Sequence, residues 1–159
     1  MNNIAFIGTG LMGFPMAKNL LKNGYNVSVY DKNLYKAEKL SKYGASISKS
    51  LKEVVKNSEI IITMVTDDES VMSIINNSDF INNLKNNSIM IDMSSTKPIT
   101  SKKAKELLKE KKIDFLDAPV SGGTIGAEEA TLAIMVGGDE KVFEKVTKIL
   151  KTMGNARLV

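Results

Sequence analysis

The chain has 159 residues, of which 43% are hydrophobic and 25% are charged, as is typical of a globular protein with a buried core. Its net charge is +4, but lysines alternate with acidic residues and only 6% of residues are aromatic, so the composition does not favour nucleic-acid binding. The absence of cysteine and histidine excludes disulfide bonds, a zinc site of the usual kind and a histidine general base. We predict one domain over residues 1–159 and no metal site.

The hydropathy pattern contains no apolar run that approaches the roughly 20 residues required to span a bilayer. No charged-then-apolar leader precedes the first predicted strand. We therefore expect a soluble, cytoplasmic protein without membrane contact. Any proton transfer would have to use lysine, aspartate, glutamate, tyrosine or a hydroxyl group.

Short apolar runs alternate with segments of helical periodicity along the whole chain. The predicted elements begin with a strand at Asn3–Gly8, a helix at Gly13–Asn23, a strand at Val27–Tyr30, a helix at Leu34–Tyr43, a strand at Ala45–Ile47 and a helix at Leu51–Asn57. They continue with a strand at Glu59–Val65, a helix capped by Asp67 or Asp68 that ends near Ile75, and a strand at Ser88–Asp92. The last are a helix from Pro98 to Lys111, strands at Asp114–Pro119 and Leu132–Val136, a helix at Glu140–Met153 and a short strand at Arg157–Val159.

Two segments have no regular pattern in this interpretation. The asparagine-rich stretch Asn76–Asn87 is predicted to be irregular and anchored by Phe80, Ile81 and Leu84. The glycine-bearing stretch between Pro119 and Leu132 is predicted to be a loop.

The near-continuous apolar run EIIITMV is typical of a parallel strand buried on both faces. The alternation of strands and helices therefore predicts an α/β fold with a doubly wound, mostly parallel sheet.

The stretch FIGTGLMG places Gly8, Gly10 and Gly13 in a G-x-G-x-x-G pattern between the first strand and the first helix. In a Rossmann-like dinucleotide-binding domain, the first glycine makes the tight turn and the second lets the backbone approach a pyrophosphate. The third allows close packing of helix on strand, and the helix N-terminus favours the anion. The glycine pattern alone is also compatible with a simple surface turn, but its position between strand and helix favours the dinucleotide site.

Asp31 ends the second predicted strand, close to the offset of about 20 residues at which an acid binds a ribose hydroxyl. A carboxylate there repels a 2′-phosphate, so the sequence favours NAD over NADP. The neighbouring Lys32 weakens that preference. The alternative is an ordinary surface aspartate.

Three further groups of residues lie at the ends of predicted strands, at the sheet edge where parallel α/β proteins bind ligands. Ser121, Gly122 and Gly123 offer backbone N–H groups and a hydroxyl to a carboxylate or phosphate, although a plain glycine-rich loop explains them equally. The run Ser94–Thr96 places hydroxyls near the same edge, where they either face a nicotinamide or cap the helix that begins at Pro98. Val65 and Thr66 follow the central strand and either line the cleft or serve ordinary packing.

Taken together, the stretches IGTGLMGFPMAKNL, ITMVTDDESV, IDMSSTKP, FLDAPVSGGTIGA and TLAIMVGG resemble the N-terminal domain of the β-hydroxyacid dehydrogenases. This is the family of 3-hydroxyisobutyrate dehydrogenase and tartronate semialdehyde reductase. The stretches occur in the family's order and cover essentially the whole chain. The sequence departs from the family's pattern at Tyr25, Thr66 and Ala130, where histidine, proline and glycine are usual.

The resemblance implies a role for each matching residue. The implied pyrophosphate-binding residues are Gly8, Thr9, Gly10, Leu11, Met12 and Gly13. Asp31 is the implied ribose ligand, Val65 and Thr66 line the cofactor cleft, and Ser95 contacts the cofactor near its nicotinamide. Ser121, Gly122 and Gly123 are the implied binding loop for the substrate's carboxylate.

Proteins of this family also have parts to which no stretch of these 159 residues is similar. In this family the catalytic lysine and an all-helical, dimerising domain follow the cofactor domain. The chain is therefore expected to bind NAD as part of a homo-oligomeric 3-hydroxyacid dehydrogenase and to be inactive by itself. The alternatives are a semialdehyde or glyoxylate reductase of the same superfamily and a stand-alone, non-catalytic dinucleotide-binding module.

Overall fold

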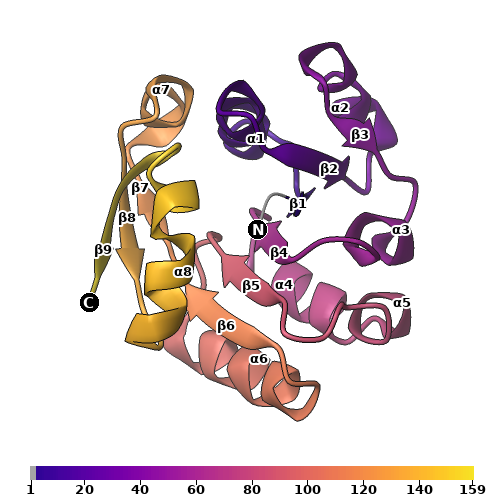
Figure 1. Cartoon of the computed structure of the whole chain (residues 1–159), viewed down its shortest axis with the longest axis vertical. Helices are drawn as coiled ribbons and strands as arrows, with labels where there is room; N and C mark the ends of the chain where they lie inside the picture. The colour runs from indigo at the N-terminus through magenta and orange to yellow at the C-terminus, as the bar shows by residue number, and fades with distance from the viewer. Residues whose placement is uncertain (1–2) are drawn as a thin grey trace.

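A central sheet of parallel strands organises the computed structural model, which describes residues 3–159 (Figure 1). Six strands lie in the order β3-β2-β1-β4-β5-β6, and every neighbouring pair is parallel. The bounds are β1 Asn3–Ile7, β2 Asn26–Tyr30, β3 Ser46–Ile47, β4 Ile60–Thr63, β5 Ile89–Asp92 and β6 Asp114–Asp117. This arrangement confirms the predicted doubly wound α/β fold, whose strand order reverses between β1 and β4.

Helices connect the strands and cover both faces of the sheet. Their bounds are α1 Gly13–Lys22, α2 Leu34–Glu38, the 3-10 helix η1 Ser41–Tyr43, α3 Leu51–Val55, α4 Asp68–Ile75, α5 Ser78–Ile81, α6 Pro98–Glu110, α7 Gly123–Glu129 and α8 Glu140–Leu150. Asp67 caps α4 by accepting a 2.8 Å bond from the Ser70 N–H. Asp139 caps α8 in the same way, and Pro98 stands in the first turn of α6 as predicted.

A smaller sheet follows β6. It contains β7 (Val120–Ser121), β8 (Leu132–Val136) and β9 (Gly154–Leu158), with β7 antiparallel and β9 parallel to β8. Reciprocal backbone hydrogen bonds between Asp117 and Gly137, at 3.0 and 2.7 Å, join β6 to the segment after β8. The end of β6 is thereby fixed against the small sheet.

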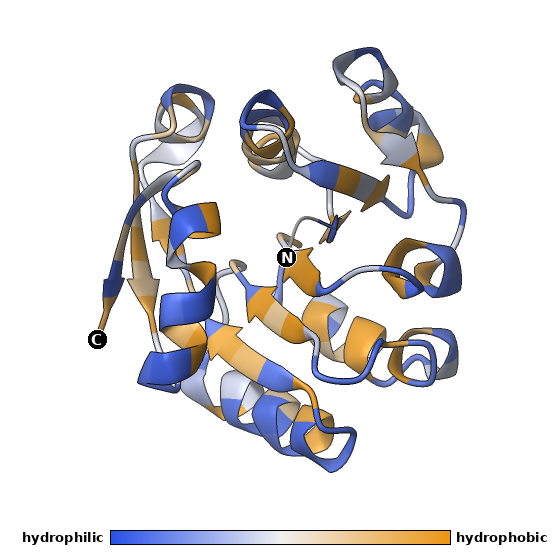
Figure 2. Cartoon of the chain, in the orientation of Figure 1, coloured by the Kyte–Doolittle hydropathy of each residue, from blue (hydrophilic) through white to orange (hydrophobic). Residues whose placement is uncertain are grey.

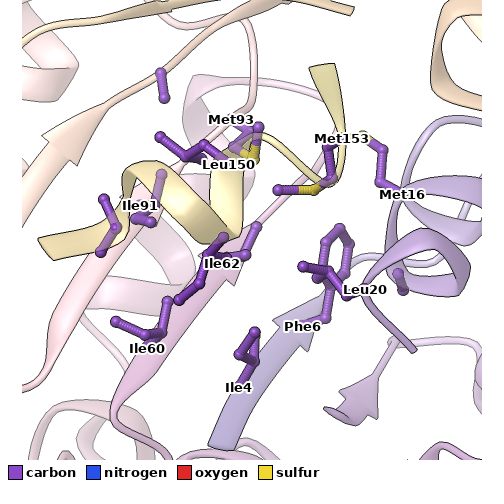
Figure 3. Packing of buried hydrophobic residues seen from close by; sticks show 14 of the residues in the cluster. Ile4, Phe6, Met16, Leu20, Ile60, Ile62, Ile91, Met93, Leu150 and Met153 are labelled. Atoms are coloured by element: carbon purple, nitrogen blue, oxygen red, sulfur yellow. The ribbon is translucent and has the colours of Figure 1, made fainter. Parts of the chain in front are cut away.

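The core consists of two apolar clusters, one on each face of the main sheet. Successive residues of β1 alternate between them: Ile4 and Phe6 face α1 and α8, whereas Ala5 and Ile7 face α3, α4 and α6. Figure 3 shows the first cluster, in which side chains from β1, β4 and β5 meet those of α1 and α8. In Figure 2 the central strands are mainly apolar, and the helices alternate between apolar and polar residues. Burial on both faces explains the continuous apolar run in β4.

Two predicted segments differ from the structure before β5. The predicted helix Leu34–Tyr43 is divided into α2 and η1, because the buried Leu40 donates its N–H to Ala37 in the tighter i to i−3 pattern. The prediction that Asn76–Asn87 is irregular was wrong at α5. The Asn77 side chain caps that helix by accepting from the Asp79 N–H at 2.9 Å, and Phe80 is buried beneath it.

The region after β6 also differs from its prediction. The predicted loop between Pro119 and Leu132 contains β7 and α7, although Gly123 and Gly126 lower the intrinsic helix propensity. A methyl group at Gly126 would approach Leu132 Cδ2 at 3.2 Å, so a glycine here lets α7 pack closely on β8. The last helix ends at Leu150 instead of Met153, and the last strand begins three residues earlier than predicted, at Gly154.

Candidate functional site

The candidate site lies at the carboxyl ends of the central parallel strands, where the strand order reverses between β1 and β4. Gly8 follows β1 and donates its N–H to Tyr30 at the end of β2 at 2.9 Å. Met64 follows β4 and donates to Ile7, also at 2.9 Å. The glycine loop, Asp31 and the segment after β4 therefore meet at one edge, which is the usual ligand-binding position in such sheets.

Two of the three glycines in the loop are required by the packing of the chain itself. Gly8 has φ +102°, and a methyl group on it would overlap the Met64 carbonyl oxygen. A methyl group on Gly13 would overlap the Gly8 carbonyl oxygen and lie 3.2 Å from Phe6 Cε1. These contacts explain why the turn and the first helical residue have no side chain.

Gly10 is different, because no contact with another residue between 3 and 159 requires a glycine there. A methyl group on Gly10 would meet no atom within 4 Å, and its φ lies outside the left-handed region. The next residue, Leu11, is 84% exposed. The surface of the loop is therefore open at Gly10, and a side chain there would fill the space next to the backbone.

The N-terminus of α1 adjoins this open surface. Met12, at the N-cap position, provides no side-chain hydrogen bond to the first turn, and the first turn contains no acidic residue. The Phe14 N–H donates to the Gly10 carbonyl at 3.0 Å. The partial positive charge of the helix terminus is therefore directed toward the glycine loop without a side-chain acceptor.

A cavity of about 590 Å³ extends from the glycine loop along α1. Thr9, Gly10 and Leu11 line it at one end. Its ionisable lining residues are one acid and four bases: Glu128, Lys18, Lys22, Lys36 and Lys39. This excess of positive charge, added to that of the helix terminus, favours an anionic ligand.

Asp31 is held in a defined orientation beside the loop. Its Oδ2 accepts hydrogen bonds from the Thr9 N–H at 2.8 Å and from the Thr9 hydroxyl at 3.1 Å. Its Oδ1 accepts from the Asn33 N–H at 2.9 Å. The structure thus brings Asp31 together with the glycine loop 22 positions earlier in the chain.

The hydroxyl residues after β5 differ in exposure. Ser94 is buried, and its Oγ accepts a 2.9 Å hydrogen bond from the Val65 N–H, which links this loop to the segment after β4. Ser95 and Thr66 are exposed, and the Thr66 hydroxyl lies 3.4 Å from that of Ser70. Val65, Thr66 and Ser95 therefore lie around adjacent strand ends, outside the cavity beside α1.

The predicted substrate residues lie at the start of α7. Ser121 ends β7, Gly122 and Gly123 have φ +140° and +64°, and all three are exposed. The buried side chain of Asn19 in α1 donates to the Ala127 carbonyl in α7 at 2.8 Å. This bond ties the helix after the serine–glycine loop to the helix after the glycine loop, and Figure 1 shows the two helices side by side.

Sequence reasoning missed two carboxylates at this edge. Asp92 and Asp117 occupy paired positions at the ends of β5 and β6. Burial raises the pKa of Asp92, although hydrogen bonds from Ser94 and Thr63 act in the opposite direction. Burial and then the charge of Asp92 raise the pKa of Asp117. The sequence feature that could have revealed this pair is an aspartate at the end of each of two apolar runs, IMID and FLD.

The described residues, 3–159, contain neither a cluster of metal ligands nor a membrane-spanning helix. Within that range, no three Asp, Glu, His or Cys side chains come together as ligands for a metal ion. None of the helices there has the length and apolar character needed to cross a bilayer.

Comparison with known proteins identifies the domain. Residues 3–159 match the family described as the NAD binding domain of 6-phosphogluconate dehydrogenase. The chain belongs to this family. Relatives of this domain include proteins named 3-hydroxyisobutyrate dehydrogenase and 2-hydroxy-3-oxopropionate reductase, which confirms the resemblance found in the sequence. Its relatives are oxidoreductases.

Individual relatives support the same assignment. The chain is 42% identical over 152 residues to 2-hydroxy-3-oxopropionate reductase of Escherichia coli, covering 95% of this chain and 52% of that protein. It is 40% identical to 2-(hydroxymethyl)glutarate dehydrogenase of Eubacterium barkeri, covering 95% and 50%. The structure of Mycobacterium tuberculosis 3-hydroxyisobutyrate dehydrogenase with L-serine superposes with a TM-score of 0.95 at 33% identity, covering 99% and 54%. The chain thus spans about half the length of these relatives.

Proposed function

We propose that residues 1–159 form one dinucleotide-binding domain, in which Gly10 lies against the pyrophosphate. The supporting observation is that Gly8 and Gly13 are required by internal packing, whereas Gly10 has open space where a side chain would be. A ligand that approaches the backbone explains that glycine. Thr9, Leu11 and Met12 complete the loop, and the N-terminus of α1 supplies positive potential to the anion.

The adenosine end of the dinucleotide is assigned to Asp31. Its carboxylate is oriented by Thr9 and Asn33 at the edge of the glycine loop. A carboxylate there accepts hydrogen bonds from ribose hydroxyls and repels a 2′-phosphate. We therefore propose NAD as the preferred cofactor and NADP as the weaker ligand.

The nicotinamide end is assigned to the neighbouring strand ends. Val65 and Thr66 line the cleft after β4, and Ser95 contacts the cofactor from the loop after β5. When bound, the nicotinamide would donate a hydride to a substrate carbon or accept one from it. Val65, Thr66 and Ser95 would bind and orient the nicotinamide ring.

We further propose that the complete enzyme is a 3-hydroxyacid dehydrogenase of the 3-hydroxyisobutyrate dehydrogenase type. Ser121, Gly122 and Gly123 would bind the carboxylate of its small hydroxy-acid substrate, through backbone N–H groups and one hydroxyl. The lysine that handles the hydroxyl proton in this family has no counterpart among these residues, so the domain alone should not turn over substrate. A semialdehyde reductase is the second candidate, since one close relative is the E. coli 2-hydroxy-3-oxopropionate reductase.

Calorimetric titration of the 159-residue chain with NADH and then with NADPH tests the proposal. We expect saturable binding of NADH and binding of NADPH that is at least about tenfold weaker, which corresponds to about 1.4 kcal/mol. Absence of binding by both would contradict the dinucleotide assignment. Equal affinity for the two would retain that assignment and contradict the role of Asp31.

A further inference from the structure

The buried carboxylate of Asp92, at the end of β5, accepts hydrogen bonds from the end of β4 and from the loop after β5. Asp92 is 1% exposed. Its Oδ1 accepts from the Thr63 hydroxyl at 2.8 Å and from the Ser94 N–H at 3.1 Å. Its Oδ2 lies 3.5 Å from the donating hydroxyl of Thr96. Thr63 ends β4, whereas Ser94 and Thr96 belong to the loop after β5.

This set of bonds continues to the segment after β4. The Ser94 Oγ accepts from the Val65 N–H at 2.9 Å, so Ser94 is bonded to Asp92 on one side and to Val65 on the other. Asp92 therefore holds both the segment that carries Val65 and the loop that carries Ser95. These two residues are the proposed contacts of the nicotinamide half of the cofactor.

The neighbouring aspartate provides an internal comparison. Asp117 occupies the paired position at the end of β6, but its buried Oδ1 has no hydrogen-bond partner among residues 3–159. Burial of a carboxylate is costly unless its oxygens are bonded. Asp92 is buried at the same edge with hydrogen-bond donors from both adjoining segments, whereas the Asp117 carboxylate interacts with Ser101 of α6.

We propose that Asp92 is a positioning residue for the nicotinamide half of the cofactor site. It fixes the segment after β4 and the hydroxyl loop after β5 in one arrangement, without touching the ligand. The glycine loop follows β1 and Asp31 follows β2, and the two are joined by hydrogen bonds that do not involve Asp92. This inference rests on the proposed function, since it requires a dinucleotide at this edge of the sheet.

The test compares NADH with ADP, which is NADH without its nicotinamide riboside. Calorimetric titrations use the wild-type chain, Asp92→Ala, the conservative variant Asp92→Asn and the matched control Asp117→Asn. For Asp92→Ala we expect about tenfold weaker NADH binding, the effect of one or two hydrogen bonds, with ADP affinity unchanged within about twofold. Asp92→Asn keeps an acceptor at Oδ1 and should restore most of the NADH affinity. Asp117→Asn should leave both affinities unchanged.

The other outcomes overturn the proposal in distinguishable ways. Equal loss of NADH and ADP affinity in Asp92→Ala would show a general structural role. If the wild-type chain binds NADH no more tightly than ADP, the nicotinamide half of the cofactor does not bind to the segments that carry Val65 and Ser95. Binding of neither ligand by the wild type would instead overturn the proposed function, and this inference with it.

A second variant keeps the test decisive if Asp92→Ala does not fold. Ser94→Ala removes the acceptor of the Val65 N–H but leaves the carboxylate of Asp92 and its bond from Thr63. The same selective loss of NADH affinity is expected. Unchanged NADH affinity in folded Ser94→Ala would overturn the proposal.

Discussion

Thr9 donates two hydrogen bonds to a single carboxylate oxygen of Asp31, from its backbone N–H at 2.8 Å and from its hydroxyl at 3.1 Å. These bonds connect the glycine loop after β1 to the acid after β2. Because Asn33 also donates to Asp31, the carboxylate is oriented before any ligand binds. Such preorganisation reduces the ordering cost of binding.

The substitution Asp31→Asn should change the choice between NADH and NADPH. Asparagine can still accept from Thr9, so the loop is retained, but the charge that repels a 2′-phosphate is removed. We expect about tenfold weaker NADH binding, since hydrogen bonds to charged groups contribute about 1.5–3 kcal/mol, and tighter NADPH binding. Calorimetric titration of both ligands measures the ratio. Thr9→Val, which keeps the charge, is the control and should preserve the preference for NADH.

Gly13→Ala should destabilise the fold. The added methyl group would overlap the Gly8 carbonyl oxygen, so α1 must move away from β1. The expected loss is about 1–3 kcal/mol in the free energy of unfolding, measured by urea denaturation. Gly10→Ala provides the matched control and should leave that free energy unchanged. A Gly13→Ala variant as stable as the wild type would disprove this packing argument.

Asn19→Leu should weaken the connection between α1 and α7. It removes the donor to the Ala127 carbonyl and leaves that buried acceptor unpaired. The expected cost is about 1–3 kcal/mol in the free energy of unfolding. Asn23→Leu, at the exposed C-cap position of α1, should cost less, because the Asn19 carbonyl that loses its side-chain donor still accepts from the Asn23 N–H. Similar effects of the two substitutions in urea denaturation would count against the connection.

Asp117→Asn should stabilise the chain increasingly as the pH rises. Burial and the charge of Asp92 raise the pKa of Asp117 above its ordinary value of 3.8. The folded state therefore binds the proton more tightly, and the stability that this contributes below pH 3.8 is lost as the pH rises through the folded-state pKa. The amide does not ionise. The difference in free energy of unfolding between variant and wild type should thus be larger at about pH 7 than at about pH 4; a constant difference would refute this.

The sequence was most informative where a pattern depends on local physics. The apolar run around Ile60–Thr63 predicted a strand buried on both faces, and the glycine pattern predicted a tight turn at Gly8 and close helix packing at Gly13. The structure confirms these features because they follow from strand geometry and from steric limits at single positions. The side-chain caps by Asp67 and Asp139 were equally local.

Features that depend on distant contacts were not predictable. Helix α7 contains two glycines, and its packing depends on Leu132 and on Asn19, which is 108 positions away from Ala127. The hydrogen bond between Thr63 and Asp92 joins residues 29 positions apart. Neither contact leaves a local pattern in the sequence. The ligand roles of Asp31, Val65, Thr66, Ser95 and the Ser121–Gly123 loop remain predictions.

The most direct test of the account is NADH titration of Gly10→Val beside the wild-type chain, with urea denaturation of both. A β-carbon at Gly10 would meet no atom of residues 3–159 within 4 Å, so the free energy of unfolding should be nearly unchanged. The branched side chain would occupy the proposed place of the pyrophosphate, so NADH binding should be abolished. A folded Gly10→Val chain that binds NADH with wild-type affinity would contradict the assignment of this loop to the dinucleotide.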